Sequence, residues 1–417
     1  MKRSGNILLI DVGSSKIRTA LFQYSSDGTC TLDHNGVSES TGFNCGTISE
    51  YRLAVQSLKI AVDSTFERAG LKKADEVWVG HSGSHVRSEN VSEEIELAHN
   101  QPVTERIEKK MFQKASARVP KDHELLHCFQ RCTLLDGIPR ESPLNLIGNQ
   151  LHSNYHVIYS RLPVVNNIRR AFKDVGLDVT RFLFNGYSAS MSVLEPNDKA
   201  LGCLLIHLGA SACDYIVFQE GRPYLSGSIN EGWSRLVKDI AMAIHVPPEE
   251  AERLMHLEGS TSEFVEREEQ EVRTRTLFGD TKGVKRRSLN RIMSSAADDI
   301  LISIRDNLKS TLCRAHLPAG VVLTGGAALT NGLVRTVMHV FGVQARIGLP
   351  VFPLNSSRFG PESAPLIGCA CIAVSDLQLN PNAPESEAPI LSAIKSVGKK
   401  LFPGPKNPSE PEGEPES

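Results

Sequence analysis

A strand–turn–strand unit occurs twice in the sequence, and this repeat constrains the fold more than any other feature. The first copy consists of the apolar run 7–10, the turn 11–16 and the β-rich run 17–23; the second consists of the runs 201–208 and 215–220 around the turn 209–214. Internal duplication of this kind predicts a bilobed α/β fold, in which both turns face one cleft between the lobes.

The first turn carries groups that can bind a phosphate. Gly13 permits a close backbone approach, the hydroxyls of Ser14 and Ser15 can donate hydrogen bonds, and Lys16 adds positive charge. Asp11 could hold a water molecule on Mg²⁺, which usually keeps several waters in nucleotide sites. Most short Gly-Ser turns are only turns, so this hexapeptide alone does not assign a nucleotide site.

A third glycine-bearing turn follows the short apolar run 321–324. Gly325 and Gly326 come first, Ala327 follows, and a helix is predicted from about Leu329 to Phe341. A strand, a Gly-Gly turn and a helix start would allow a ligand to approach closely, and helix starts attract anions.

Helical periodicity is also present at 50–69, 164–176, 232–245, 248–257 and 290–315. Residues 84–160 alternate charged helical stretches with short polar strands, so we expect an inserted α+β subdomain there. The strongly charged stretch 263–287 is predicted to be a mobile loop or an edge.

Composition excludes several classes of protein. The net charge is −2 over 417 residues, which argues against a nucleic-acid partner. No signal peptide and no run of 18 apolar residues is present, so we expect a cytoplasmic chain that does not cross a membrane. Neither the nine cysteines nor the thirteen histidines show the spacing of a metal site, and we expect reduced thiols and no structural metal.

The three turns, taken in order, resemble the first phosphate, second phosphate and adenosine motifs of the actin superfamily. The stretches that carry this resemblance are 11–16, 205–214 and 323–332. The FtsA branch is favoured by further stretches at 79–85, 182–190, 239–241 with 247–253, and 341–348. The resemblance covers residues 5–376 and implies a bilobed actin-like fold, two duplicated ribonuclease-H-like lobes, with an inserted α+β subdomain in the first lobe.

On this basis the chain divides as follows: 1–83 with 161–197, first lobe core; 84–160, inserted FtsA-type subdomain; 198–231 with 316–376, second lobe core; 232–315, smaller subdomain of the second lobe; 377–389, linker; 390–402, amphipathic helix; 403–417, disordered tail.

The second phosphate turn departs from the family pattern Asp-Ile-Gly-Gly-Gly-Thr-x-Asp. His207 replaces the first carboxylate and cannot hold a Mg²⁺-bound water as an anion does. Ala210 and Ser211 replace glycines, and positive φ there would cost about 1 kcal/mol each. We therefore predict weak binding of Mg-ATP, little or no hydrolysis, and no catalytic residue. Alternatively, His207 is a satisfied buried histidine and Asp214 alone carries the metal shell.

The resemblance places Glu252 where a relative's helix approaches ribose and adenine, although a glutamate on an exposed helix is more often a solvated charge. The complete set of predicted nucleotide residues is Asp11, Gly13, Ser14, Ser15, Lys16, Gly209, Ala210, Ser211, Asp214, Glu252, Gly325, Gly326 and Ala327.

A basic amphipathic segment, 390–402, follows a Pro-rich linker at 376–389. At 100° per residue its apolar side chains share one face, and three lysines flank or oppose that face. Such a helix lies in the interface of an anionic membrane, although it could instead pack on the protein's own surface. The predicted membrane contacts are Ile390, Leu391, Ile394, Lys395, Val397, Lys399, Lys400, Leu401 and Phe402.

The family resemblance implies three protein partners: the C-terminal peptide of FtsZ, further copies of the chain in actin-like protofilaments or mini-rings, and later division proteins. It also implies a peripheral location on the inner face of the cytoplasmic membrane, at the septum. The peptide would bind the smaller subdomain, where the candidate contacts are Arg286, Arg287, Arg291 and Arg305. The basic run 285–287 could equally be a solvated loop.

Three other interpretations stay open at this point. A PilM-like pilus protein shares the actin core and the inserted subdomain. A sugar- or acetate-kinase-like enzyme would need an intact second phosphate turn. An MreB-like filament protein would place its inserted subdomain elsewhere in the chain.

Overall fold

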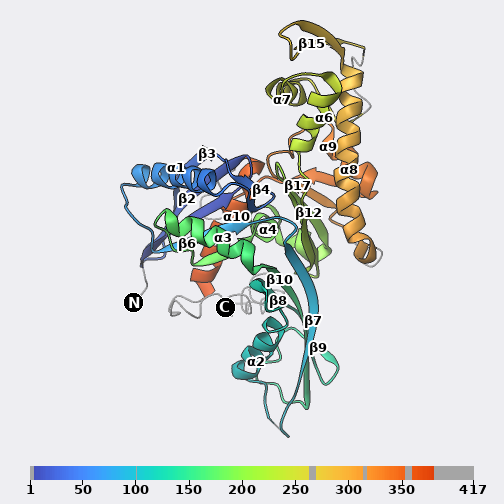
Figure 1. The fold of residues 1–417 in the computed structure, drawn as a ribbon. Helices are drawn as coiled ribbons and strands as arrows, with labels where there is room; N and C mark the ends of the chain where they lie inside the picture. The colour runs from blue at the N-terminus through green and yellow to red at the C-terminus, as the bar shows by residue number, and fades with distance from the viewer. Residues whose placement is uncertain (1–3, 100, 263–268, 313–316, 353–358, 380–417) are drawn as a thin grey trace, which may run out of the picture.

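The computed structural model describes residues 4–99, 101–262, 269–312, 317–352 and 359–379 (Figure 1). Within these ranges no helix is both long enough and apolar enough to cross a bilayer. The predicted linker beyond 379, the amphipathic segment 390–402 and the tail 403–417 lie outside the described residues.

In the described part of the chain, two five-stranded sheets have the same topology. The first has the order β11 (Arg181–Phe184), β6 (Glu76–His81), β1 (Gly5–Val12), β2 (Lys16–Tyr24) and β3 (Cys30–Glu39). The second has the order β18 (Ala345–Ile347), β17 (Val321–Thr324), β12 (Cys203–Leu208), β13 (Cys213–Gln219) and β14 (Arg222–Ile229). In each sheet a three-stranded antiparallel meander is extended by two parallel strands. The predicted bilobed duplication is therefore confirmed.

The central strands are continuous apolar runs because helices cover their sheets. Leu8, Leu9 and Ile10 in β1 are fully buried, as are Leu204 and Leu205 in β12. Helix α1 (Tyr51–Ala69) covers β2 and β3, and α9 (Leu333–Phe341) covers β17 and β18. Gly70 ends α1 in the left-handed conformation, as its sequence position predicts.

Two helices cross between the sheets and join the lobes: α4 (Asn185–Val193), which follows β11, and α10 (Ala364–Leu379). They pack closely enough that a Cβ on Gly368 would lie 1.6 Å from the carbonyl oxygen of Ser188. The short helix α5 (Pro196–Leu201) then leads into β12, and therefore this strand begins two residues later than predicted.

The inserted subdomain is a four-stranded antiparallel sheet with one helix against it. Its strands are β7 (Val86–Glu96), β10 (Gln150–Arg161), β8 (His123–Leu135) and β9 (Ile138–Arg140). The helix is α2 (Glu105–Ser116), whose N-cap Thr104 accepts a hydrogen bond from the Ile107 amide. Strands β7 and β10 are longer than the short strands predicted. Helix α3 (Leu162–Asp174) returns the chain to the first lobe.

Although the inserted subdomain belongs covalently to the first lobe, it also packs on the second. Strand β7 runs beside β14, and hydrogen bonds join the two bodies there; we call this the β7–β14 contact. The bonds include Ser88 Oγ to the Ser226 carbonyl (2.6 Å), the Ser226 amide to Ser88 Oγ (3.3 Å), Asn90 Nδ2 to the Tyr224 carbonyl (3.0 Å), His156 Nε2 with Ser226 Oγ (2.9 Å) and Arg222 to the Gln130 carbonyl (2.6 Å).

The smaller subdomain projects from the second lobe at the top of Figure 1. It comprises α6 (Ser234–Ile244), α7 (Pro248–Leu257), the hairpin β15 (Glu271–Arg275) and β16 (Thr281–Lys285), and the long helix α8 (Arg286–Leu312). The sequence predicts a mobile loop or an edge over 263–287; the loop prediction is wrong for 271–275 and 281–285, which form the two strands of the hairpin, and for 286–287, which begin α8. Val272 and Thr274 are buried between exposed charged residues, so these residues form a strand.

The third turn is longer than predicted. Helix α9 begins at Leu333, after Gly332 at φ +81°, and not at Leu329. The predicted helix start directly behind Gly325 and Gly326 is therefore wrong, and no helix terminus is available there to attract an anion.

Replacement of Gly368 by Ala tests the helix crossing. The intrinsic helix propensity of Ala favours this change by about 1 kcal/mol. The overlap with a fixed backbone carbonyl should outweigh that gain, giving a net loss of about 2 kcal/mol or more in the free energy of unfolding. Urea denaturation measures the loss. Gly326→Ala is the control, because its Cβ would meet no atom closer than 3.8 Å; equal stability of the two variants would contradict the prediction.

Candidate functional site

The two duplicated turns share one backbone geometry. The Gly13 amide donates to the Lys16 carbonyl and the Gly209 amide to the Ala212 carbonyl, both at 3.1 Å. A Cβ on Gly13 or Gly209 would lie 2.8 or 2.6 Å from the same carbonyl oxygens. Both glycines are therefore required by close approach of the backbone.

No residue in either turn has a positive φ. The predicted strain at Ala210 and Ser211 is therefore wrong. The requirement for glycine in this turn falls on Gly209, and the two residues after it adopt ordinary backbone angles that tolerate a side chain.

The two turns touch each other across the cleft. The Ser14 and Ser211 hydroxyls form a direct hydrogen bond. Ser211 Oγ also accepts a hydrogen bond from the Cys45 amide at 2.8 Å. Cys45 lies in the tight connection between β4 (Phe43–Asn44) and β5 (Thr47–Ile48) of the first lobe. The Ser211 side chain thus joins its own lobe to two separate segments of the other.

Two buried carboxylates lie at the inner end of the cleft. Asp11 accepts a hydrogen bond from Asn185 Nδ2 at 2.9 Å, and Asp214 accepts one from Ser82 Oγ at 2.6 Å. His207 Nδ1 is 3.4 Å from the same Asp214 oxygen. The other Asp214 oxygen and Asn185 Oδ1 are buried without a protein partner among the described residues. Such acceptors suit the waters of a hydrated Mg²⁺, so this side of the cleft fits a cation.

Burial raises the pKa of Asp11, and the nearby Asp214 adds to this effect. His207, Arg18 and the hydrogen bond from Asn185 act in the opposite direction. The family's carboxylate at position 207 would add a further negative charge here, so a histidine relieves the repulsion between buried acids.

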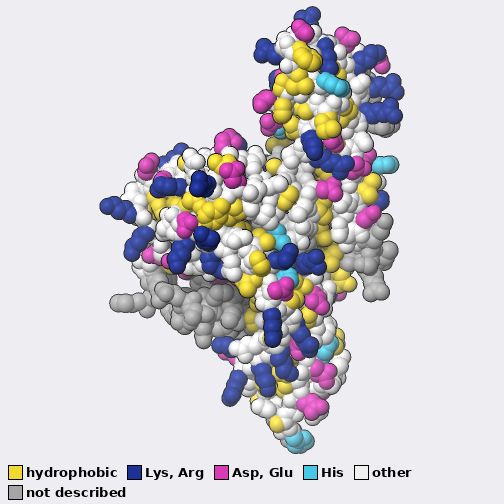
Figure 2. All heavy atoms as spheres, in the orientation of Figure 1, with side chains coloured by type: hydrophobic (Ala, Val, Ile, Leu, Met, Phe, Trp, Pro, Cys, Tyr) yellow, Lys and Arg dark blue, Asp and Glu magenta, His cyan; other side chains and the backbone are white. Residues whose placement is uncertain are grey.

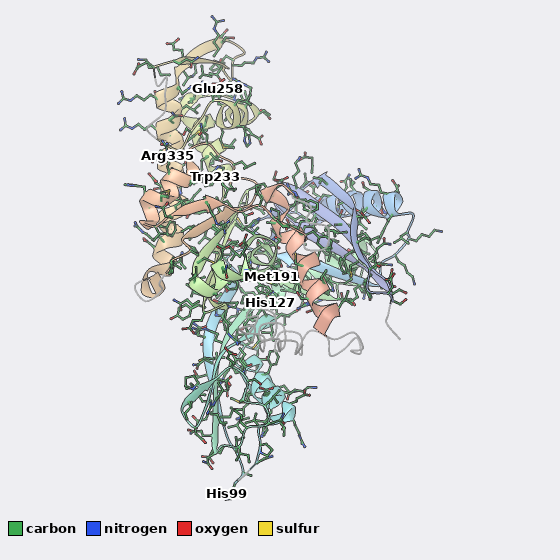
Figure 3. All side chains as sticks on the ribbon, turned by 180° about the vertical axis from the view of Figure 1, so that it is seen from behind. His99, His127, Met191, Trp233, Glu258 and Arg335 are labelled. Atoms are coloured by element: carbon green, nitrogen blue, oxygen red, sulfur yellow. The ribbon has the colours of Figure 1, made fainter. Side chains whose placement is uncertain are left out.

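The third turn packs against the second. Gly325 has φ +94°, and a Cβ there would lie 2.4 Å from the Leu208 carbonyl oxygen, whereas a Cβ on Gly326 would meet only Glu362 Cβ, at 3.8 Å. The Ala327 amide donates to the Leu208 carbonyl at 3.4 Å. Trp233, at the base of the smaller subdomain (Figure 3), donates from Nε1 to Thr330 at 2.8 Å and ties this turn to the start of α6.

The remaining predicted nucleotide residues do not converge on the cleft. Lys16 forms an ion pair with Glu39 on β3, and the Ser15 side chain is exposed. Glu252 lies on the exposed face of α7, where His256 one turn later is 3.9 Å away. The turns therefore do not fit a bound phosphate in this structure, because Lys16 is paired with Glu39 and the hydroxyls of Ser14 and Ser211 bond to each other.

No group of three or more His, Cys, Asp or Glu side chains within the described ranges could hold a metal ion by itself. Buried histidines nevertheless gather where the lobes and the inserted subdomain meet. They are His81, His85, His127, His156 and His207. Their scattered positions in the sequence gave no signal of this cluster.

Hydrogen bonds satisfy the rings of His81, His85, His127 and His156. His81 Nε2 lies 2.9 Å from Ser160 Oγ and 3.0 Å from His85 Nε2, and His156 bonds to Asn90 and Ser226. Burial lowers the pKa of His85 to about 4 and that of His156 to about 3.

The candidate peptide contacts lie on α8, where basic side chains gather on the outer edge of the smaller subdomain (Figure 2). Arg286 forms an ion pair with Glu258, and Arg287 is exposed with Glu269 3.9 Å away. Arg291 is exposed one turn further on. Arg305 contacts the Val340 carbonyl, roughly 28 Å from Arg286 along the helix, so the four arginines do not form one surface.

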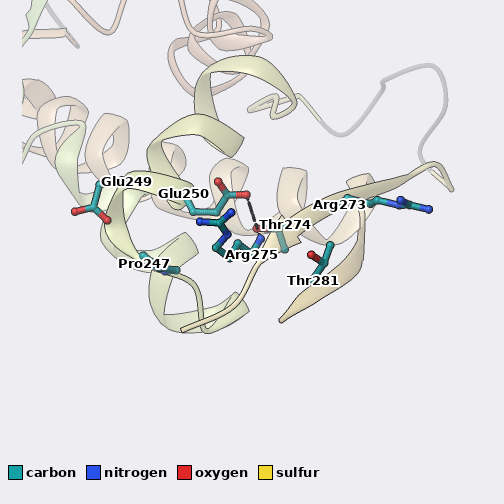
Figure 4. Close-up of a pocket in the computed structure, with 7 residues that line it drawn as sticks. All are labelled: Pro247, Glu249, Glu250, Arg273, Thr274, Arg275 and Thr281. Atoms are coloured by element: carbon teal, nitrogen blue, oxygen red, sulfur yellow. Dashed lines mark hydrogen bonds between the residues drawn. The ribbon is translucent and has the colours of Figure 1, made fainter. Parts of the chain in front are cut away.

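A cavity of about 460 Å³ opens between the start of α7 and the β15–β16 hairpin (Figure 4). Glu250 holds its wall together by accepting from Arg253 (2.7 and 2.8 Å) and Thr274 (2.9 Å). These bonds, those from Arg253 first, lower the Glu250 pKa to about 2. Arg273 and Arg275, also in the wall, have no acidic partner within ion-pair distance among the described residues. The alternation of charged and buried residues over 271–275 is the signal that could have revealed this strand.

The matched lobes, the crossing helices and the four-stranded insertion define an actin-like protein with an inserted SHS2-type subdomain. The family model described as "Cell division protein FtsA" matches residues 204–368, and "SHS2 domain inserted in FTSA" matches 83–159. The FtsA protein of Pseudomonas aeruginosa is 24% identical over 354 residues, 84% of each chain, and that of Borreliella burgdorferi is 26% identical over 84% of this chain and 86% of its own. The chain belongs to the FtsA family of cell division proteins.

Solved structures show the same fold at low sequence identity. The type IV pilus biogenesis complex PilM–PilN matches with a TM-score of 0.59 and 15% identity, over 88% of this chain and 98% of that chain. MreB5 of Spiroplasma citri bound to ADP matches with a TM-score of 0.57 and 12% identity, over 90% and 98%. At such identities these likenesses show the actin-like fold alone.

The buried histidines predict an acid-labile fold. Burial lowers the pKa of His81, His85, His127 and His156 below the unfolded value near 6.5. The stabilisation that each neutral ring provides is therefore complete above that pH, and it declines as the pH falls towards the folded value. Between pH 7 and 5.5, His85 and His156 should each remove about 1.2 kcal/mol from the free energy of unfolding. Urea titrations at several pH values measure the slope.

Replacement of either histidine by Asn should flatten that slope. His99, exposed at the far end of the inserted subdomain (Figure 3), provides the matched control, and His99→Asn should leave it unchanged. Identical slopes for all three variants would assign the acid lability to other groups.

Proposed function

We propose that this protein is a division adaptor, which binds the C-terminal peptide of FtsZ and tethers the FtsZ ring to the inner face of the cytoplasmic membrane at the septum. The observation that carries this proposal is the shared family membership of two separate regions, the second lobe and the inserted subdomain. Actin-like self-association and contacts with later division proteins belong to the same proposal, as does the domain division set out above.

The arrangement of the ends suits a tether. Helix α10 runs away from the cleft and ends at Leu379 beside the first lobe, whereas the smaller subdomain projects at the opposite side (Figure 1). A peptide held by the smaller subdomain would therefore bind far from the end of α10, after which the proposed lipid anchor follows in the sequence.

We place the peptide contact on the outer part of the smaller subdomain. The cavity wall supplies Arg273 and Arg275, and the start of α8 supplies Arg287 and Arg291. Arg287 is paired only with the exposed Glu269, at 3.9 Å, and the other three have no ion pair among the described residues. Such cations can attract an acidic peptide at a lower cost than Arg286, which would first have to break its ion pair with Glu258.

Charge reversal tests the peptide site. The double variant Arg273→Glu/Arg275→Glu should bind a fluorescent FtsZ C-terminal peptide at least roughly tenfold more weakly in anisotropy titrations, because attraction becomes repulsion. Lys72→Glu/Lys73→Glu is the matched control, an exposed basic pair in the first lobe. Unchanged affinity in the arginine variant would remove these residues from the site. A pilus-protein peptide that bound better than the FtsZ peptide would favour the PilM-like role.

The membrane contact is assigned to 390–402, on its sequence. Each lysine near an anionic surface contributes about 1 kcal/mol, and a 13-residue helix containing Gly398 is marginal alone, so one copy should bind weakly and several should bind together. Deletion of 390–402 should abolish co-sedimentation with anionic liposomes. Deletion of 403–417 is the control and should retain it; retained binding without 390–402 would refute the assignment.

Nucleotide binding is part of the proposal in a reduced form. Solved MreB5 structures carry ADP and AMPPNP in a fold of this kind. For this chain we propose weak binding of Mg-ATP with little or no hydrolysis. Asp11, Asp214 and Asn185 offer oxygens to a hydrated cation, which would neutralise phosphate charge, while the turns make poor phosphate ligands.

A further inference from the structure

The Ser211 hydroxyl is placed as a ligand oxygen would be. It meets the Ser14 hydroxyl of the first turn and the Cys45 amide of a separate loop, both of which point into the cleft from the opposite lobe. Hydroxyl and amide donors converging on one oxygen are the groups with which proteins surround a phosphate.

The surrounding contacts hold this arrangement in place. The Cys45 thiol lies 3.2 Å from the Ser211 carbonyl oxygen. Next along the cleft, the amides of Gly83 and Ser84 donate to Ser228 Oγ (3.1 Å) and Asn230 Oδ1 (2.8 Å). The first lobe therefore makes hydrogen bonds to side chains of the second along a continuous seam.

The backbone of the second turn is independently fixed. The Gly209 and Ala210 carbonyls accept hydrogen bonds from the Trp233 and Ser234 amides at the start of α6, at 3.0 and 2.9 Å. Since the turn has no positive φ, Ser211 occupies its position without strain. The side chain can therefore hold its oxygen in the cleft at little conformational cost.

We propose that the Ser211 hydroxyl takes the place of a phosphate oxygen in this cleft, so that the lobes close on each other without a nucleotide. This inference deepens the proposal of weak nucleotide binding and does not depend on the adaptor role. A glycine at 211, as in the family pattern, would leave the donors on Ser14 and Cys45 free for a phosphate.

An engineered disulfide tests closure in the ligand-free protein. Two hydroxyls in hydrogen-bond contact place their Cβ atoms near the separation that a disulfide spans. The double variant Ser14→Cys/Ser211→Cys, built on Cys45→Ser to remove the neighbouring thiol, should oxidise readily without nucleotide. Ser15→Cys/Ser211→Cys on the same background is the control, since the Ser15 side chain is exposed and makes no such contact. Failure of the first pair to cross-link, or equal cross-linking of both, would overturn the proposal.

Nucleotide affinity tests the role of the hydroxyl. Ser211→Gly should bind Mg-ATP at least roughly tenfold more tightly than the parent in equilibrium dialysis. Ala210→Gly is the matched control, because it adds the same backbone freedom in the same turn while the hydroxyl remains. If Ala210→Gly gained as much, or if neither Ser211→Gly nor Ser211→Gly/His207→Asp gained affinity, the proposal would be wrong. Neither result would change the proposal that the parent protein binds Mg-ATP weakly. That proposal and the proposed role of the Ser211 hydroxyl can therefore fail independently of each other.

Discussion

The crossing of α4 and α10 is the contact on which the positions of both turns depend. The two helices approach so closely that only glycine fits at 368, and Ser192 Oγ donates to the Ala364 carbonyl at 2.8 Å. At one end of α4, Asn185 holds Asp11 of the first lobe. At the outer end of α10, Arg181 forms an ion pair with Asp376 at 2.7 Å. The register of one sheet against the other, and with it the width of the cleft, follows from this crossing.

The duplicated fold could be predicted because it rests on local patterns. Apolar runs of strand length around glycine turns indicate buried hairpins wherever they occur, and the same pattern occurred twice. Conformation inside the second turn could not be predicted in this way. The glycines of the family pattern suggested positive φ at 210 and 211, but the structure has none there. Glycine is required at 209 instead, because a Cβ would collide with the backbone. A sequence does not show whether a glycine is needed for positive φ or for close backbone approach.

The partners of individual side chains could not be predicted from the sequence either. The α8 arginines are alike in sequence, yet Arg286 is engaged with Glu258 while Arg291 is exposed, because that difference is set by elements that pack from elsewhere. The histidine cluster could not be predicted for the same reason. Strands β6, β8, β10 and β12 each contribute a histidine to it, and no residue spacing within one strand indicates that these side chains lie close together. Charged residues over 263–287 suggested a loop, because the buried Val272 and Thr274 are too few to dominate the composition.

Through the β7–β14 contact, the inserted subdomain connects the first lobe to the second. Its two covalent connections belong to the first lobe, while its hydrogen bonds to Ser226, Tyr224 and Arg222 belong to the second. A rotation of the lobes about the helix crossing must therefore shear these bonds or carry the insertion along. Force applied to the insertion by anything that grips it is transmitted to both lobes at once, and the cleft is mechanically coupled to a surface far from it.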